Sequence, residues 1–305
     1  DTYHYIPIYE DIIKYGEIAH IEPLYCWMAE NLPHDYYIWR LAIWGGAFVL
    51  YLTLAKRFNI DNKFLGFSFA VILLQQFVVT RASFGISLFL LSSSLLYKNI
   101  LKNKEISICL GILGIIASFS LHRSMPIFLF IAVGVLIPLN KKNLIISIIL
   151  FPLIRIGILP YVEDLFMSNF FNDQTNEFAN TYLNREASIL NIRGLLPQYI
   201  IYSARLILIS ILIKHIAFND DAPMFIRKLL QFTYILFYIA ILFWGQNVSS
   251  FVTSRTIHFM CFPLTIVLAY YLSTTPSTTR MFKTSIFLFI FYDLYQFLYH
   301  AWKWW

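Results

Sequence analysis

Charged residues and cysteine are both scarce in this chain. Only 13% of the 305 residues are Asp, Glu, Lys or Arg, whereas 59% are hydrophobic and 18% are aromatic. A soluble domain carries about 25% charged residues, so the sequence lacks the polar surface that water requires. Cys26, Cys109 and Cys261 are odd in number and show no metal-ligand spacing, which indicates that they are packing residues.

The chain also lacks the short motifs of many enzyme classes. No Walker loop, GxGxxG, HExxH or GxSxG element occurs, which removes the usual support for ATP-driven transport, dinucleotide chemistry, metalloproteases and hydrolases. The net charge of +6 comes from basic residues scattered between apolar segments, so we expect no nucleic-acid partner. The run 219–221 (Asn-Asp-Asp) is similar to a metal-holding acidic pair, but a solvated loop explains it better. We expect no metal and no cofactor.

Long apolar runs take the place of these features. The run from Phe64 to Tyr97 has 34 residues, which as one helix would be about 51 Å long, against a bilayer core of about 30 Å. Lysine marks the cytoplasmic side of a membrane, and the run has Lys63 before it and Lys98 after it. Both ends therefore lie on one side, which predicts two helices joined by a hairpin with Arg81 at the turn. Such runs predict an all-α, polytopic integral membrane protein with about ten transmembrane helices. The predicted spans are 39–56, 64–80, 82–97, 106–121, 125–139, 144–160, 198–214, 229–245, 257–272 and 284–300.

One terminal segment and one long loop lie outside these spans. Residues 1–38 are acidic and aromatic, with no run long enough to cross a bilayer, and residues 18–32 predict a short interfacial helix broken at Pro23. Residues 39–305 form the predicted transmembrane domain. Its 37-residue connection, 161–197, is long enough to predict a functional element such as a lid.

Lysine and arginine are distributed differently among the connections. Ten of the twelve lysines fall in alternate connections, which the positive-inside rule places in the cytoplasm. The other connections, together with the outer halves of the spans, hold eight arginines. Arginine is thus concentrated on the outward side, where the positive-inside rule disfavours basic residues. A guanidinium group binds phosphate oxygens through a planar fork of donors, so this distribution suggests a polyanionic ligand. Pairing of the arginines with outer carboxylates is the alternative. The eight are Arg40, Arg81, Arg123, Arg155, Arg185, Arg193, Arg205 and Arg255.

The outward turn at Arg81 follows a pair of amides. Gln75 and Gln76 lie one to two helical turns deeper than Arg81, where polar amides either join helices or line a cavity. A charge inside an apolar run is a functional hypothesis by default. An arginine that snorkels to the headgroups is the alternative.

Two further outward turns carry candidate residues. His122, Arg123 and Ser124 end the fourth predicted span, where histidine has the chemistry of a base near neutral pH and arginine that of a diphosphate ligand. Arg255 follows several hydroxyl residues at the predicted start of the ninth span, an arrangement typical of an anion site at a helix N-terminus. A structural histidine and a capping run are the respective alternatives.

Five short sequence features, each present once, are spread along the chain. They are Asp1-Thr2 followed by a tyrosine, Glu22-Pro23 before the first span, Arg81 after the glutamine pair, His122-x-Ser124, and Arg255 late in the sequence. Together they resemble the EpsG-type family of polysaccharide polymerases, the Wzy-like enzymes that build O antigens, capsules and exopolysaccharides. Family members carry a membrane helix ahead of the Asp1-like position, so the resemblance implies a missing upstream segment, with removal of a signal as the alternative.

The resemblance implies a Wzy-like or GT-C-like helical membrane glycosyltransferase in the bacterial inner membrane, with its active face in the periplasm. The implied reaction transfers a growing glycan from undecaprenyl diphosphate to a sugar hydroxyl of a lipid-linked repeat unit. The implied partners are that lipid-linked oligosaccharide, the bilayer, a chain-length regulator and a flippase. On this basis the diphosphate ligands are Arg81, Arg123, Arg193 and Arg255, the base is His122, Glu22 or Asp1, and the groove residues are Gln75, Gln76 and Ser124.

Other classes of membrane protein stay open as alternatives. An O-antigen ligase or a membrane acyltransferase would use similar outward His and Arg residues with a different acceptor. A flippase for lipid-linked oligosaccharides would need charges along the whole membrane path, whereas the inner halves of the predicted spans have almost none.

Overall fold

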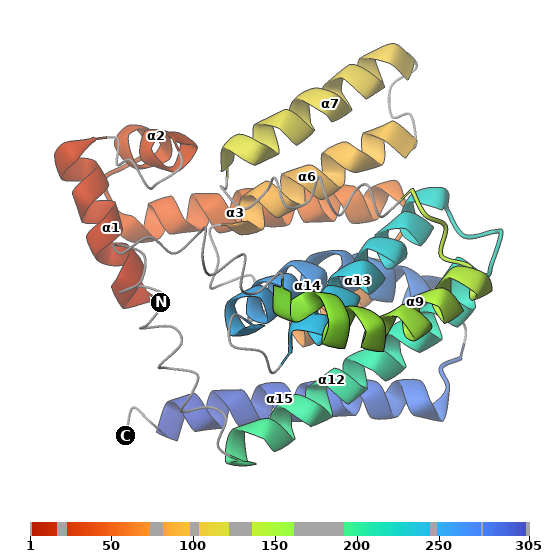
Figure 1. Ribbon diagram of the computed structural model, residues 1–305. Helices are drawn as coiled ribbons and strands as arrows, with labels where there is room; N and C mark the ends of the chain where they lie inside the picture. Colours follow the sequence, from red (N-terminus) through yellow and green to blue (C-terminus); the bar gives the residue numbers. More distant parts are fainter. Residues whose placement is uncertain are drawn as a thin grey trace. The chain divides into compact units, whose positions relative to one another are not determined.

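The computed structural model describes residues 2–16, 23–73, 82–97, 104–121, 136–161, 192–244, 249–275 and 277–302. All regular secondary structure in these ranges is helical, which confirms the all-α prediction for this part of the chain (Figure 1). Six of the described helices are long and apolar enough to cross a membrane, and two shorter apolar helices accompany them. The fold therefore suits a bilayer, while the count of about ten spans stays a prediction. The six are Tyr36–Arg57, Lys104–Leu121, Lys141–Tyr161, Tyr199–Ala217, Met224–Phe243 and Thr256–Thr274, and the shorter two are Asn62–Leu73 and Ala82–Tyr97.

The chain divides into two compact units. The first unit comprises residues 1–133 with 223–225, and the second comprises residues 134–222 with 226–305. The helices of the first unit are α1 (Thr2–Tyr15), α2 (Pro23–Asn31), α3 (Tyr36–Arg57), α4 (Asn62–Ser68) with the π-helical turn η1 (Phe69–Leu73), α6 (Ala82–Tyr97) and α7 (Lys104–Leu121). Those of the second unit are α9 (Lys141–Leu153) with η2 (Ile154–Ile158), α12 (Ile192–Leu212) with η3 (Ile213–Ala217), nearly all of α13 (Met224–Phe243), α14 (Ser249–Thr274) and α15 (Arg280–Trp302).

Helices α1 and α2 pack against the start of α3 through an aromatic cluster. The rings of Tyr9 and Trp39 have centroids 5.4 Å apart, and the indole N–H of Trp39 donates to the carbonyl of Tyr25 at 3.1 Å. Pro23 begins α2, where the N–H that proline lacks would have no intrahelical partner. Gly16 ends α1 with a φ of 77°, a backbone conformation that glycine adopts without strain. A helix is thus present at 23–31, within the predicted interfacial helix 18–32. Residues 18–22 lie outside the description, and the interfacial position stays a prediction.

Polar side chains cap the starts of three helices. The carboxylate of Asp35 accepts from the N–H groups of Tyr37 and Ile38 at 2.7 and 3.1 Å at the start of α3. Asn140 caps α9 in the same way. These helices begin at residues 36, 62 and 141, earlier than the predicted 39, 64 and 144. Each starts directly after a polar capping residue, which satisfies N–H groups of the first turn without adding to the apolar pattern.

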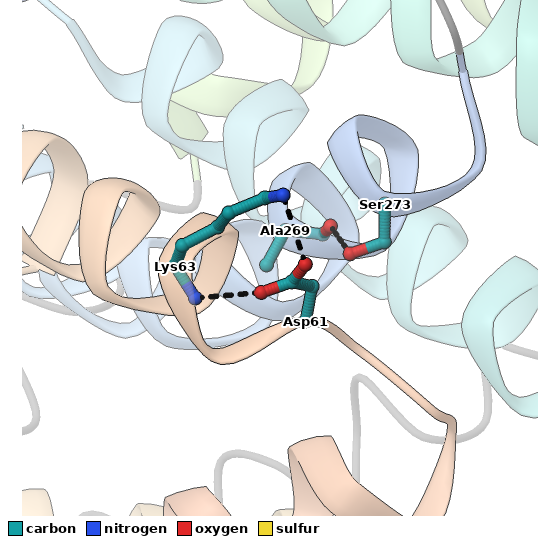
Figure 2. Close-up of polar contacts among 4 residues, drawn as sticks. All are labelled: Asp61, Lys63, Ala269 and Ser273. Carbon is teal, nitrogen blue, oxygen red and sulfur yellow. Dashed lines mark hydrogen bonds and ion pairs between the residues drawn. The ribbon is translucent and has the colours of Figure 1, made fainter.

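Figure 2 shows the cap of α4, in which Asp61 accepts from the backbone N–H of Lys63 at 2.9 Å and pairs with its ammonium at 3.2 Å. The pKa of the Asp61 carboxyl is lowered, chiefly by the backbone hydrogen bond from Lys63. Desolvation opposes this effect, and the Lys63 ammonium adds to it. This cap therefore stabilises α4 above the carboxyl's unfolded pKa and is lost as the pH falls through the lowered value. The same figure shows Ser273 donating to the carbonyl of Ala269 at 2.8 Å within α14, a common way for a hydroxyl to be satisfied inside an apolar helix.

One predicted boundary was wrong. Residues 136–140 form a turn that leads into α9, although the predicted span 125–139 includes most of them. Residues 125–135 lie outside the description. An apolar pattern continued here through a proline-containing segment, so hydrophobicity alone misplaced the end. Helix α12 begins at Ile192, inside the predicted loop 161–197, but its apolar segment of membrane length begins at Tyr199, next to the predicted start at 198.

Helices α6 and α7 lie side by side (Figure 1). Small residues lie between them. A Cβ added at Gly114 of α7 would lie 2.9 Å from the Cβ of Ser92 on α6, and one added at Gly111 would lie 3.0 Å from the Ser92 carbonyl oxygen. Small residues that let two backbones approach are a common way to join helices in lipid, where apolar contact with a neighbour differs little from contact with acyl chains.

Gly114→Ala should therefore destabilise the first unit, because the added methyl group has no room. Overpacking of this kind costs about 1–3 kcal/mol. The matched control is Gly45→Ala on α3, where an added Cβ meets nothing within 4 Å. Thermal unfolding in detergent should show a lower midpoint for Gly114→Ala and an unchanged or higher one for Gly45→Ala. Equal midpoints would show that the α6–α7 contact is not close-packed.

Candidate functional site

Most of the predicted site residues lie outside the described part of the chain. These are Asp1, Glu22, Gln75, Gln76, Arg81, His122, Arg123 and Ser124. Arg193 and Arg255 belong to α12 and α14, but only their places in the helices are described. The roles of all ten residues, and their proposed grouping around one ligand, stay predictions.

The position of Arg255 in its helix differs from the expected one. Helix α14 begins at Ser249, so Arg255 lies six residues inside it and not at its first turn. The free N–H groups and the positive end of the helix dipole are confined to the first turn. The expected combination of Arg255 with a helix N-terminus is therefore wrong, whereas its role as an anion ligand through its side chain stays a prediction.

The helices of the second unit bring basic residues of different kinds to opposite ends. Ser147 of α9 bonds to the hydroxyl of Tyr234 at 2.6 Å, and Arg155, eight residues later, reaches the last residues of α13, so these two helices run parallel. At their beginning, the Lys141 ammonium lies 6.0 Å from the ring of Phe218 just after η3. Arg155 therefore lies toward one end of this bundle and Lys141 at the other, in agreement with the predicted separation of arginine from lysine.

Arg155 is held by backbone carbonyl groups. It lies in η2, the π-helical turn that follows Pro152. Its Nη1 donates to the carbonyls of Ile241 and Leu242 at 2.7 and 2.9 Å, and its Nη2 donates to that of Trp244 at 2.6 Å. The last carbonyls of a helix have no intrahelical donors and carry a partial negative charge, so a guanidinium is well suited to cap them. Arg155 is thus a capping residue of α13, which neither the polyanion nor the carboxylate interpretation anticipated.

An aromatic group adjoins this capped end. The ring of Trp244 lies between two tyrosines of α12, with its centroid 4.6 Å from that of Tyr199 and 4.8 Å from that of Tyr202. Tyr199 is about half exposed. Rings with a polar atom on an apolar body are typical of membrane interfaces, and their flat faces also stack against planar or ring-shaped ligands.

Arg205 lies about one helical turn after Tyr202 on α12, and its environment differs from that of Arg155. Only 8% of its surface is exposed. Its guanidinium carbon is 5.7 Å from the ring centroid of Tyr202 and 5.9 Å from that of Phe289 on α15, which packs beside α12 (Figure 1). Its Nε is buried without a hydrogen-bond partner. Among the described residues it forms no ion pair with a carboxylate.

The environment of Arg205 compensates its charge only in part. Each contact with a ring contributes about 0.5–2 kcal/mol, whereas withdrawing a charged side chain from water costs several kcal/mol. Arg205 follows Tyr199, the first residue of an apolar helical segment, by six residues, which is about 9 Å along the helix axis. The helix geometry leans its side chain toward the N-terminus of α12, and hence toward Tyr202 and Trp244. We identify the group Arg205, Tyr202, Trp244, Tyr199 and Phe289 as the candidate site, and call it the α12 site.

A partial signal for this site is present in the sequence. Arg205 is one of the eight outward arginines but not one of the predicted site residues, although an arginine near the middle of a predicted span is itself a functional signal. The three aromatic residues carried no signal of their own, because 18% of the chain is aromatic. Their grouping depends on which helices are neighbours.

Other candidates have structural roles. Arg40 donates to the hydroxyl of Tyr36 at 2.8 Å and lies 4.2 Å from the ring of Trp44 in the first unit. His258 is buried and contacts the rings of Phe259 and Phe262. Asp220 is fully exposed and lies 3.4 Å from Arg227, as expected of a solvated loop. Within the described ranges, no group of three or more His, Cys, Asp or Glu side chains is arranged to hold a metal.

Comparison of the chain with models of protein families, with curated proteins and with solved structures gave no match. The physical arrangement of the described residues therefore carries the functional argument.

Arg155→Met should lower the stability of the second unit, since it removes the guanidinium donors from three carbonyl acceptors. Hydrogen bonds to a charged group contribute about 1.5–3 kcal/mol each. Arg155→Lys should recover only part of the loss, because one ammonium cannot span the carbonyls as a guanidinium does. The measurement is the unfolding temperature in detergent, with Arg280→Met at the exposed start of α15 as the control. A wild-type midpoint for Arg155→Met would exclude the capping role.

Proposed function

We propose that this chain is a polysaccharide polymerase of the EpsG or Wzy-like type, with about ten transmembrane helices in the bacterial inner membrane. It transfers a growing glycan from undecaprenyl diphosphate to a lipid-linked repeat unit at the periplasmic face. The observation that carries the proposal is the environment of Arg205 in the second unit. Arg205 is buried without an ion pair among the described residues and lies with aromatic rings toward one end, whereas Lys141 lies at the other.

A polymerase of this kind needs cations where the diphosphate leaves. The acceptor hydroxyl loses its proton to a base, its oxygen forms a bond to the anomeric carbon, and the bond from that carbon to the phosphate oxygen breaks. The electron pair departs with undecaprenyl diphosphate, so negative charge grows on that leaving group. Guanidinium groups that are already placed stabilise this charge without reorganisation. Cleavage of the activated sugar–phosphate bond drives the transfer, so no nucleotide is required.

Roles for individual residues follow from the resemblance described above. In this proposal Arg81, Arg123, Arg193 and Arg255 bind the diphosphate, and His122, Glu22 or Asp1 takes the acceptor proton. Gln75, Gln76 and Ser124 line the groove for the sugars. The proposal places a chain-length regulator and a flippase beside the enzyme, as in the family that the chain resembles.

The alternatives differ in the product that they leave. An O-antigen ligase or a membrane acyltransferase would also use outward His and Arg residues, and a flippase would move the lipid-linked unit without changing it. In a deletion strain a polymerase defect leaves a lipid core that bears one repeat unit. A ligase defect leaves no repeat unit attached, and a flippase defect blocks export. Only the first of these phenotypes agrees with the proposal.

Arg81→Lys should abolish long polymer when it is tested in that deletion strain, since it keeps the charge but loses the two-pronged phosphate contact. The measurement is the length distribution of surface glycan on a gel, with the amount of protein in the membrane followed in parallel. Arg280→Lys provides the matched control, because that arginine is exposed at the start of α15 and lies in a predicted cytoplasmic connection. A full ladder from Arg81→Lys would exclude the phosphate role of that residue.

A further inference from the structure

The α12 site contains a buried cation, Arg205, whose Nε has no hydrogen-bond acceptor among the described residues. The Arg205 guanidinium has five N–H donors, it is more than nine-tenths buried, and its Nε has no partner. Its described contacts are the faces of two rings, Tyr202 and Phe289, which attract the charge but accept no strong hydrogen bond. A planar donor set enclosed in this way is complementary to an oxyanion with several acceptor atoms, and phosphate has this chemistry.

The surface around Arg205 indicates the source of that anion. The neighbouring residue on α12 is Leu206 and the one next to Phe289 on α15 is Ile290, and both are about half exposed. On α15, Phe287 and Phe291 are exposed as well. A ligand that approaches across such an apolar surface leaves water before it reaches the guanidinium. Free phosphate would lose its hydration without compensation, whereas a phosphate attached to a lipid brings an apolar chain that suits this surface.

The rings beyond Arg205 extend the site in one direction. Tyr202 contacts both the guanidinium and the ring of Trp244, and Tyr199 lies at the half-exposed end. Along the row, an apolar surface is followed by a cation and then by flat rings with polar edges. A lipid phosphate that bears a sugar presents the matching order of an acyl or prenyl chain, an anion and a ring with one apolar face.

We propose that Arg205 binds a phosphate group of a membrane lipid, and that Tyr202 and Trp244 form a stacking surface for a sugar attached to that phosphate. The identity of the lipid as a polyprenyl diphosphate rests on the proposed function. The binding of a lipid phosphate by Arg205 does not, because it follows from the burial, the contacts and the apolar surroundings of this side chain. Arg205 thereby joins the predicted arginines as a direct ligand of the substrate.

Binding to the purified chain in phosphatidylcholine nanodiscs tests this inference. The probe is undecaprenyl diphosphate, and inorganic pyrophosphate and undecaprenol serve as competitors that carry only the anion or only the lipid. We expect tight binding that neither competitor displaces at the same concentration. Arg205→Met should weaken the affinity at least tenfold, Arg205→Lys should weaken it several-fold, and Arg280→Met should leave it unchanged. If pyrophosphate displaces the probe as effectively as unlabelled undecaprenyl diphosphate does, the claim that the anion belongs to a lipid is overturned. Wild-type affinity in a folded Arg205→Met variant would overturn the claim that Arg205 binds the phosphate.

A second pair of variants separates ligand binding from an internal ion pair. Asp293 follows Phe289 by one helical turn in the sequence of α15, so Asp293→Asn is the matched removal of an acidic residue from that helix. We expect Asp293→Asn to bind the probe as the wild type does. A loss equal to that of Arg205→Met would show that Arg205 serves an internal pair and would overturn the proposal. If Arg205→Met fails to fold, Arg205→Lys, which keeps the charge and the apolar stem, decides the question by its affinity alone.

The two proposals can fail independently. Retained binding of undecaprenyl diphosphate by Arg205, with no polymer formed from a lipid-linked repeat unit, would contradict the polymerase and support the lipid-phosphate site. Normal polymer length in a strain that carries Arg205→Met would overturn the site and leave the polymerase proposal standing.

Discussion

A guanidinium group inside an apolar helix must find electron-rich partners, and the described helices meet this requirement in three ways. Arg155 uses the free carbonyls at the end of α13. Arg40 uses a tyrosine hydroxyl and the face of an indole. Arg205 has two ring faces and a buried Nε without an acceptor. The first two arrangements provide acceptors within the fold, whereas the third leaves the Nε of Arg205 without one. This difference separates structural arginines from a candidate binding residue.

The same requirement explains how the second unit is built. The carbonyl end of α13 is capped from η2, and the rings of α12 pack around Trp244 just beyond that end. Arg155 thus fixes the position of Trp244 through its backbone, and Trp244 in turn contacts the tyrosine beside Arg205. A residue that holds no ligand therefore orients the surface on which a ligand would lie, which is the usual relation between a binding group and the residues that support it.

The sequence predicted the fold class well because the signal is strong and local. Long apolar runs with few charges predict helices wherever they occur, and the described helices follow the runs closely. Their first residues were placed two or three positions late at α3, α4 and α9, since capping residues such as Asp35 and Asp61 are polar and add nothing to an apolar pattern. The turn at 136–140 was missed because an apolar pattern does not reveal where tertiary packing ends a helix.

The site was harder to predict, because it depends on which helices are neighbours. The excess of arginine at one end of the bundle was visible in the sequence, and it led to Arg155 and Arg205 as members of a set. Their separate roles were not visible, since carbonyls 86 to 89 residues away hold the first and rings on α12 and α15 hold the second. Arg255 shows the converse, because its expected place at a helix N-terminus depended on the predicted start at 257, whereas α14 begins at Ser249.

Polymerisation in vitro tests the central claim most directly. The full chain is purified, reconstituted in liposomes and supplied with a repeat unit linked to undecaprenyl diphosphate, and the products are separated by length. The account predicts a ladder of lipid-linked glycans, with one undecaprenyl diphosphate released for each linkage formed. An unchanged single repeat unit, under conditions in which the folded protein binds that lipid, would contradict it.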